Sequence, residues 1–390
     1  MLTVRTQGLG ENSSASSIVH LEKEAKQIVI DGRDDIYSVA VLPNGKHVVS
    51  GDYEGKIRCW RTKNGKEMGT PMDAGSRFFS MAVSRDGKWI VSGTRWGWVT
   101  VWNAKSHSKV TEFKAHGKFV RAIDISPDAK RIMTGSNDCT ACVWSLSTGK
   151  ELLVSLKHDN YVVAAKFSPN GRLFATATWE RPSVRVYDSQ NGSISAEFPV
   201  EVNSSLNQSL AWASDSKQLF ALSHDGYIHH IDVLAKTTLS QWHSSDKPIS
   251  IALASNGTFI AASAHSSVLF WDTTTREQIG TVIEYTHSVE SMAMSSNYDL
   301  ITSGEKGITL RALCGILPSH YFDSVIESQT ALLAIADPLL QEIQHTEVEK
   351  VEDNPSMFTC TLIPVSDITS FRRKISESRE NHPGPARPAH

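Results

Sequence analysis

Seven short turns recur along the chain, and their nearly constant spacing limits what the chain can fold into. The middle residues of successive turns lie 41 to 45 residues apart. The turns are Pro43-Asn44-Gly45, Arg85-Asp86-Gly87, Pro127-Asp128-Ala129, Pro169-Asn170-Gly171, Ser214-Asp215-Ser216, Ser255-Asn256-Gly257 and Ser296-Asn297-Tyr298. A period of about 40–45 residues, with several strands in each unit, is typical of propeller blades rather than of one continuous core.

Each unit has the pattern of a meander of short strands. In the third unit, residues 120–126, 131–135 and 140–144 are rich in β-branched and aromatic side chains. Gly, Pro, Asn, Asp or Ser bounds these runs, which predicts strands joined by tight turns. A fourth strand is predicted at 151–156 here and at 112–114 in the second unit. Opening strands are predicted at 37–42, 79–84, 162–168, 209–213, 249–254 and 289–295.

Small polar and aromatic residues mark where the second and third strands of the units end. The second strand ends at Ser50, Ser92, Thr134 and Ser303, and the third ends at Trp60, Trp102, Trp144, Tyr187 and Trp271. With these marks the units resemble WD40 repeats over about residues 27 to 317, although a Trp-Asp pair occurs only at Trp271-Asp272. The resemblance implies an all-β, seven-bladed β-propeller of WD40 type.

The resemblance also implies a structural, hydrogen-bonded tetrad of His, Ser or Thr, Asp and Trp. The matching residues in the third unit are His116, Thr134, Asp138 and Trp144. The fourth unit keeps His158 and Thr176 but has Glu180 and Tyr187 in place of Asp and Trp. The fifth unit keeps Asp225 but has Ile231 in place of Trp, and the seventh has Arg311 there.

Seven units must also close into a ring, because an open array leaves strand edges and apolar faces exposed at its ends. The seventh unit has no convincing fourth strand before Pro318, whereas the apolar run 27–30 precedes the first unit. We therefore expect residues 27–317 to form one propeller, with strand 27–30 completing blade seven.

The segments on either side of the propeller differ from it in composition. Residues 1–26 are expected to be flexible, because they are Ser/Asn-rich and have no strand pattern. Residues 318–346 carry a loose helical stripe of apolar residues interrupted by Pro338, which predicts short helices against the propeller or, alternatively, an amphipathic partner-binding element. Residues 347–390 are charged and poor in aromatics, so we expect a disordered tail.

Composition limits the partners. The formal net charge is −3 with both signs interspersed, so no overall field favours nucleic acid. No apolar run reaches the roughly 18–20 residues that span a bilayer, and residues 1–26 lack the apolar core of a signal peptide. Five unpatterned cysteines suit a reducing compartment. We expect a cytoplasmic protein, with a nuclear location left open, that binds neither membrane nor nucleic acid.

The sequence lacks the common catalytic and metal-binding motifs. It contains no Gly-rich phosphate loop, no Gly-x-Ser-x-Gly elbow and no His-Glu-x-x-His motif. Cys139 and Cys142 have metal-site spacing, but no second pair accompanies them and side chains three apart on a strand face opposite ways. We expect no catalytic residues, no metal, no cofactor and no small-molecule substrate.

Function is therefore expected on the surface. The loops that enter the first strand and the loops between the second and third strands both face the narrow top of WD40 propellers, where the family usually binds peptides. Blades one to four concentrate aromatic and arginine residues there, which are enriched at interfaces. The predicted partner-binding rim consists of Tyr37, Tyr53, Phe79, Arg95, Trp96, Arg121, Asn137, Trp179 and Arg181. The alternative is that Trp96, Trp98 and Trp179 pack between blades or against loops.

Trp179 is the strongest single candidate on this rim. Its loop, 178–182, is one residue longer than its counterparts, which we expect to lift the indole into solvent. The sequence thus predicts a non-catalytic interaction scaffold or adaptor that binds other proteins or peptide segments. One alternative is a substrate-recognition subunit, as in a ubiquitin ligase, although Thr274 stands where a Trp-Asp-x-Arg signature needs Arg. Another is a propeller enzyme that uses His224, Asp225 and His265.

Overall fold

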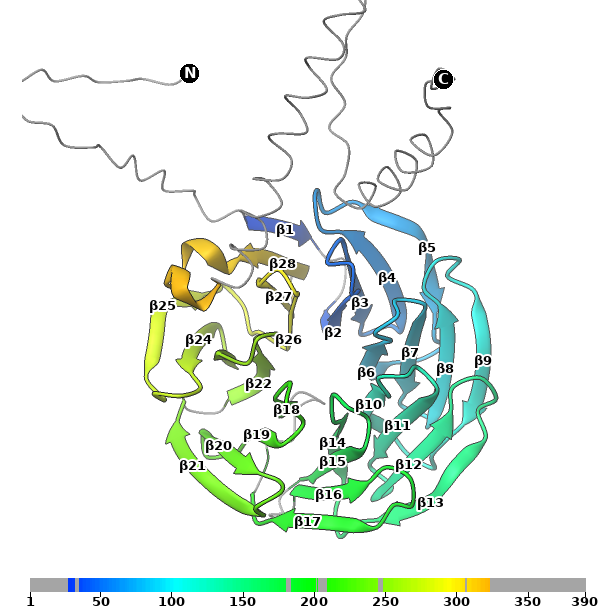
Figure 1. Cartoon of the computed structure of the whole chain (residues 1–390). Helices are drawn as coiled ribbons and strands as arrows, with labels where there is room; N and C mark the ends of the chain where they lie inside the picture. Colours follow the sequence, from blue (N-terminus) through cyan, green and yellow to red (C-terminus); the bar gives the residue numbers. More distant parts are fainter. Residues whose placement is uncertain are drawn as a thin grey trace, which may run out of the picture. The chain divides into compact units, whose positions relative to one another are not determined.

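The described residues form a ring of seven four-stranded antiparallel sheets (Figure 1). The structure, a computed structural model, describes residues 27–31, 35–179, 184–200, 202, 209–244, 248–305 and 307–322. The expectations for residues 1–26 and 347–390, and for helices within 323–346, lie outside these ranges. The predicted seven-bladed, all-β propeller is confirmed.

Within each blade the first strand lies nearest the ring centre and the following strands lie progressively outward (Figure 1). Blades one to three are β2 (Ile36–Val41), β3 (His47–Asp52), β4 (Lys56–Arg61), β5 (Glu67–Asp73); β6 (Phe78–Val83), β7 (Trp89–Thr94), β8 (Trp98–Asn103), β9 (Lys109–Lys114); and β10 (Val120–Ile125), β11 (Arg131–Ser136), β12 (Thr140–Ser145), β13 (Glu151–Lys157).

The remaining blades repeat this order, and only blade seven takes a strand from elsewhere in the chain. Blades four to seven are β14 (Val162–Phe167), β15 (Leu173–Thr178), β16 (Val184–Asp188), β17 (Ile194–Phe198); β18 (Leu210–Trp212), β19 (Gln218–Leu222), β20 (Tyr227–Asp232), β21 (Thr237–His243); β22 (Pro248–Leu253), β23 (Phe259–Ala264), β24 (Ser267–Asp272), β25 (Gln278–Glu284); and β26 (Ser291–Met294), β27 (Asp299–Gly304), β28 (Gly307–Ala312) with β1 (Gln27–Asp31).

The seven recurring turns join the first and second strands, and all seven share one backbone feature. The third residue of every turn has a positive φ, from 54° at Ala129 to 76° at Gly257. This region costs an L-residue energy but suits glycine, which explains why four of the seven positions are Gly. The 41- to 45-residue spacing of the turns in the sequence is therefore the spacing of residues with a positive φ in the structure.

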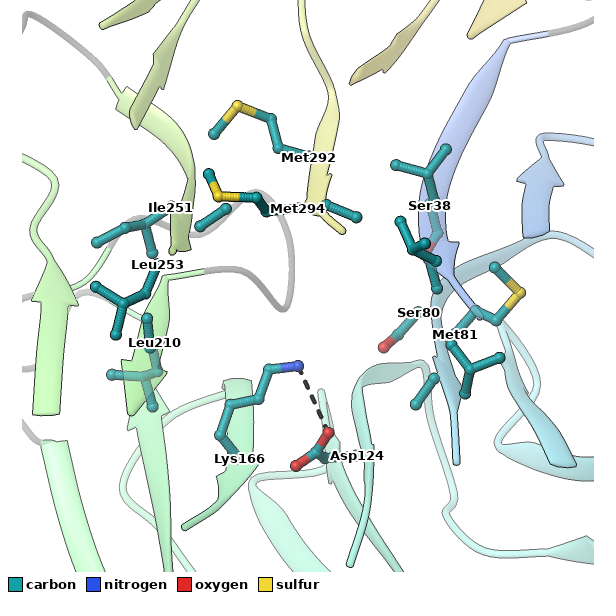
Figure 2. Close-up of a pocket in the computed structure, with 18 of the residues that line it drawn as sticks. Ser38, Ser80, Met81, Asp124, Lys166, Leu210, Ile251, Leu253, Met292 and Met294 are labelled. Atoms are coloured by element: carbon teal, nitrogen blue, oxygen red, sulfur yellow. Dashed lines mark ion pairs between the residues drawn. The ribbon is translucent and has the colours of Figure 1, made fainter. Parts of the chain in front are cut away.

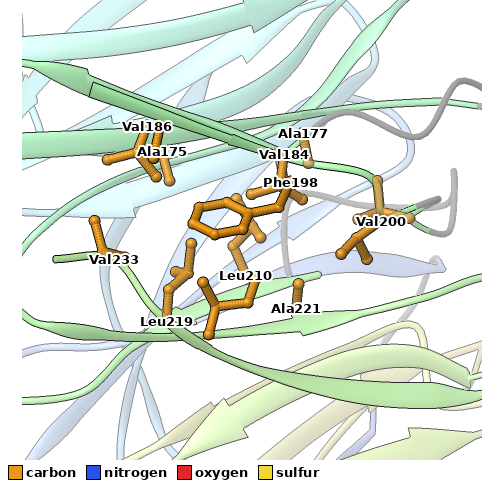
Figure 3. Packing of buried hydrophobic residues seen from close by; sticks show 14 of the residues in the cluster. Ala175, Ala177, Val184, Val186, Phe198, Val200, Leu210, Leu219, Ala221 and Val233 are labelled. Carbon is orange, nitrogen blue, oxygen red and sulfur yellow. The ribbon is translucent and has the colours of Figure 1, made fainter. Parts of the chain in front are cut away.

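The apolar core lies between neighbouring blades and not inside any one of them. The buried residues that the structure describes form seven clusters, and each cluster joins two adjacent sheets. Figure 3 shows the cluster between blades four and five, where Phe198 packs among Val184, Leu210 and Leu219. Because both faces of each sheet are covered, neighbouring residues such as Ile90 and Val91 are both fully buried.

The ring is closed by pairing the two ends of the propeller. Strand β1 lies antiparallel to β28, with Ile28 opposite Leu310 and Ile30 opposite Ile308. Ile30 is buried in the cluster that joins blades seven and one. The strand expected at 27–30 thus supplies the outer strand of blade seven.

The packed chain continues beyond residue 317, where the sequence places the end of the propeller. Two single-turn 3-10 helices follow β28, η1 (Leu313–Gly315) and η2 (Ser319–Tyr321). Tyr321 and Phe322 are buried in the cluster between blades six and seven, and the Tyr321 hydroxyl donates to Asp272 Oδ2 over 2.7 Å. The helical pattern of apolar residues did not predict this packing. Residues 319–322 are held by contacts of Tyr321 and Phe322 with the apolar cluster between blades six and seven.

In blade three, the four residues that the resemblance assigns to a tetrad form one hydrogen-bonded chain. Trp144 Nε1 donates to Thr134 Oγ1 over 2.8 Å, and Thr134 Oγ1 lies 2.7 Å from His116 Nε2. His116 Nδ1 lies 3.0 Å from Asp138 Oδ2, and since a carboxylate only accepts, Nδ1 carries the proton. Burial raises the pKa of Asp138, but hydrogen bonds from His116 and Thr140 outweigh it and hold that pKa well below its usual range.

Other blades keep parts of this chain. Trp60 donates to Ser50 over 2.7 Å and Trp102 to Ser92 over 3.0 Å. In blade four, Tyr187 replaces the Trp, and its hydroxyl lies 3.1 Å from His158 Nε2.

Strand register identifies the equivalent residues in the last two blades. In blade six, Ala262 stands at the Ser/Thr position, so Trp271 Nε1 has no described acceptor. In blade seven the register places Thr302 there, nine residues before Arg311, whereas Thr134 precedes Trp144 by ten. The shorter turn between β27 and β28 causes that difference.

Asp138→Ala should lower the free energy of unfolding by about 1–3 kcal/mol, because it leaves the buried His116 Nδ1–H without its carboxylate. Glu54→Ala, an exposed change at the matching position of blade one, should cost less than about 0.5 kcal/mol. Urea titrations of both variants measure the difference. A larger loss for Glu54→Ala would contradict the assigned register.

His158 should make stability fall as the solution is acidified. Burial lowers the pKa of His158 to about 4, below the ordinary value of 6.5, so the unfolded chain takes up a proton first. The stability contribution is complete above pH 6.5 and is lost as the pH falls towards 4. From pH 7 to 4.5 the wild type should lose about 2 kcal/mol more than His158→Gln, by denaturant titration at each pH. Parallel pH profiles for the two proteins would contradict this assignment.

Candidate functional site

Two sets of loops meet at one end of each blade, because the first two strands run antiparallel. The start of the first strand therefore lies beside the end of the second. A repeated backbone hydrogen bond holds the two loops together at this end. It joins Tyr53 N to Asp35 O, Arg95 N to Arg77 O, Asn137 N to Phe119 O and Trp179 N to Tyr161 O, at 2.8 to 3.0 Å.

On blades one and two, aromatic rings and a guanidinium group stack on one another. The rings of Tyr37 and Tyr53 lie 5.6 Å apart, centre to centre. Arg77 of blade two lies 3.5 Å above the Tyr53 ring, which is close for a cation–π contact. This contact connects the loops of neighbouring blades.

On blades two and three, a second arginine lies close to two aromatic rings. The Arg95 guanidinium is 5.1 Å from the Trp96 ring and 5.3 Å from the Phe119 ring. Trp96 is 59% exposed, which is unusual for so large an apolar side chain. Arg121 Nε donates to Asn137 Oδ1 over 3.0 Å and lies 5.8 Å from Phe119.

On blade four, Trp179 is positioned differently from the expectation. The indole is half-buried, lies 5.7 Å from the Tyr161 ring, and packs against the cluster between blades four and five. The longer loop does not lift it into solvent, because Tyr161 and the inter-blade core attract its apolar face. Trp179 is thus only partly accessible at the surface, and it is not the exposed anchor that the sequence predicts.

We call the surface made by these residues the rim arc: Tyr37, Tyr53, Arg77, Arg95, Trp96, Phe119, Arg121, Asn137, Tyr161 and Trp179. Arg77, Phe119 and Tyr161 were missed in the sequence. All three lie nine residues before the centre of a turn. The predicted Phe79 and Arg121 lie seven residues before theirs, two positions later in the repeat. The predicted Arg181 and the side chain of Phe79 lie outside the described residues.

Charge is unevenly distributed around this end of the ring. Within the described residues, no carboxylate lies within ion-pair distance of Arg77 or Arg95, which contact aromatic rings instead. Burial raises the pKa of Tyr37, and the negative charges of Asp35 and Glu290 raise it further. The rim is therefore acidic near blades seven and one and basic over blades two and three.

A cavity of about 390 Å³ lies in the centre of the ring, lined by the innermost strands (Figure 2). Its wall combines apolar side chains, among them Ile251, Met292 and Met294, with polar backbone and side-chain groups. The single ion pair drawn there joins Lys166 Nζ and Asp124 Oδ1 at 3.6 Å. Asp124 Oδ2 also accepts from the backbone of Phe167 over 2.8 Å, so this carboxylate has a structural role.

The three residues of the enzyme alternative do not form a joint site within the described residues. His224, Asp225 and His265 do not line the central cavity, and within the described residues no hydrogen bond or ion pair joins any two of them. Across the described ranges, no cluster of three His, Cys, Asp or Glu side chains could hold a metal ion. Among the residues that the structure describes, no helix is long and apolar enough to cross a membrane.

The geometry defines a seven-bladed β-propeller with a polar–aromatic rim at one end. Three segments, residues 25–61, 107–145 and 150–188, match the WD40 family model, described as "WD domain, G-beta repeat". The chain is a WD40-repeat β-propeller, a fold that generally serves as a protein-interaction scaffold. A search of curated proteins finds no match to the chain.

Proposed function

We propose that the chain is a non-catalytic scaffold or adaptor that binds an acidic protein segment on the rim arc. The observation that carries this proposal is the pair Arg77 and Arg95. Both guanidinium groups lie against aromatic rings, and within the described ranges neither has a carboxylate partner. Arginine prefers planar acceptors, so a carboxylate of a bound segment would complete both groups.

The aromatic residues of the rim arc favour an extended peptide as the ligand. Tyr53, Trp96 and Phe119 lie on three consecutive blades and are linked by the two arginines. A rigid, pre-stacked surface of this kind loses little side-chain entropy when a partner binds. Trp96 is the most exposed of these rings and is therefore the proposed anchor.

We also propose that the protein acts in a reducing compartment, the cytoplasm or the nucleus. The four cysteines that the structure describes are free thiols. Burial raises the pKa values of Cys59 and Cys142 to about 11, which keeps both thiols protonated and unreactive near neutral pH.

The double variant Arg95→Ala/Trp96→Ala tests the scaffold proposal. A phage-displayed library of random peptides is selected on the wild-type protein, and the enriched peptides should be rich in Asp and Glu. Their affinity for the double variant should fall at least about tenfold, since central aromatic and Arg residues contribute most interface energy. Binding should also weaken as salt is added.

The matched control is Lys150→Ala/Leu152→Ala, which removes an exposed cation and a half-exposed apolar side chain at the outer strand of blade three. Circular dichroism establishes that both double variants are folded. Equal affinity of the wild type and the folded Arg95→Ala/Trp96→Ala protein for the selected peptides would rule out the rim arc.

A further inference from the structure

Blade seven carries two altered residues among the tetrad positions, Tyr285 and Arg311, and keeps a threonine at a third position, Thr302. Tyr285 lies twelve residues before the centre of its turn, as His116 and His158 do. Its backbone N–H donates to Ser266 in the preceding blade, as that of His158 donates to Cys139. Tyr285 therefore stands where the other two blades have His.

The other two positions follow from strand register. Thr302 faces Thr309 across the sheet and Arg311 faces Leu300, as Thr134 and Trp144 face Cys142 and Ile132 in blade three. Arginine thus occupies the place of the tetrad tryptophan. A flexible cation has replaced a flat, neutral ring that fills space.

A cavity of about 350 Å³ lies beside the sheet of blade seven, with Arg311 in its wall. Gln27, Val29, Thr302, Thr309 and Arg311 line one wall, and their alternation places them on the same face of the sheet. The loop from Glu284 to Val289 lines the other wall. Gln27, Val29, Glu284 and Thr286 are exposed, so the cavity has a mouth on the protein surface.

Two buried donors in this cavity make no hydrogen bond of normal geometry to a described residue: Arg311 Nε and the Tyr285 hydroxyl, which lies beside the Thr302 side chain. Arg311 uses Nη2 to donate to Gln27 over 2.9 Å, and its guanidinium carbon lies 5.8 Å from the Tyr285 ring centre. Glu284 also lines the cavity, but it forms no ion pair with Arg311 within the described residues. A buried donor without an acceptor is unfavourable, most of all on a charged group.

We propose that the cavity of blade seven is a binding site for a carboxylate group. A carboxylate provides two acceptor oxygens and one negative charge, which matches a guanidinium and a phenol hydroxyl that lie side by side. The carboxylate comes either from a small organic acid or from an Asp or Glu side chain of a partner protein. This site is separate from the rim arc, which lies on blades one to four.

Thermal unfolding with defined anions tests the site. The probes are sodium acetate, an acetylated and amidated tripeptide with a central Asp, and inorganic phosphate, each compared with sodium chloride at equal ionic strength. At saturating probe, a carboxylate should raise the Tm of the wild type by about 2 °C or more above the chloride reference. A shift with acetate indicates a small acid, and a shift with the tripeptide alone indicates a partner side chain.

Variants separate specific binding from general salt effects. Arg311→Gln removes the charge, and Arg311→Trp restores an indole that can donate to Thr302 and fill the cavity. Both should lose the carboxylate-specific shift, and Arg311→Trp should also raise the Tm without any probe. Arg172→Gln, an exposed arginine in the blade-four turn, should keep the full shift. If Arg311→Gln does not fold, Tyr285→Phe takes its place and should weaken the shift.

The proposal is overturned if carboxylates shift the wild type and both Arg311 variants equally, or if no probe shifts the wild type. A larger shift with phosphate than with either carboxylate would show that the ligand class is wrong. Peptide binding at the rim arc is measured separately, so either proposal can fail while the other stands.

Discussion

Apolar packing between neighbouring sheets is the interaction on which the rest of this structure depends. No blade could bury its own two faces, and each is covered only because another blade lies on either side. Closure by β1 and β28 extends this arrangement to the last pair of blades. The apolar core is thus made mainly by the strands, although Trp179 and Tyr161 in the loops also pack against it. At one end of the ring, the loops of blades one to three hold aromatic and arginine side chains in contact with one another.

Polar groups inside the ring are distributed unequally among the blades. Blades one to four pair their buried hydroxyls, indoles and imidazoles with one another. In blades five to seven, His230 Nδ1, Trp271 Nε1 and Arg311 Nε have no described partner. The half of the ring with complete networks is also the half with the rim arc. The other half contains the blade-seven cavity, with its Arg311 Nε unpaired among the described residues.

Local patterns in the sequence predicted the strands and turns well, because alternation and turn residues act over a few positions. The period predicted the ring, and the apolar run at 27–30 predicted how it closes. Contacts between blades were not predictable in this way. The Trp179 ring packs beside the Tyr161 ring. Arg77 contacts the Tyr53 ring and Phe119 contacts the Arg95 guanidinium, in each case across two neighbouring blades. In blade seven a shorter turn places the tetrad position at Thr302 and not at Ser303, which marks the end of the strand in the sequence, and one residue on a strand changes the face.

The closure of blade seven has a consequence for how the chain is made. Gln27 and Arg311, which are hydrogen-bonded across the closing pair, are 284 residues apart in the chain. At a synthesis rate of roughly 5–20 residues per second, β1 leaves the ribosome on the order of 15–60 s before β28 exists. During that interval its edge is open to any other strand, including the β28 of a second copy. Chains made close together on one messenger would therefore be the ones most exposed to exchanging this strand.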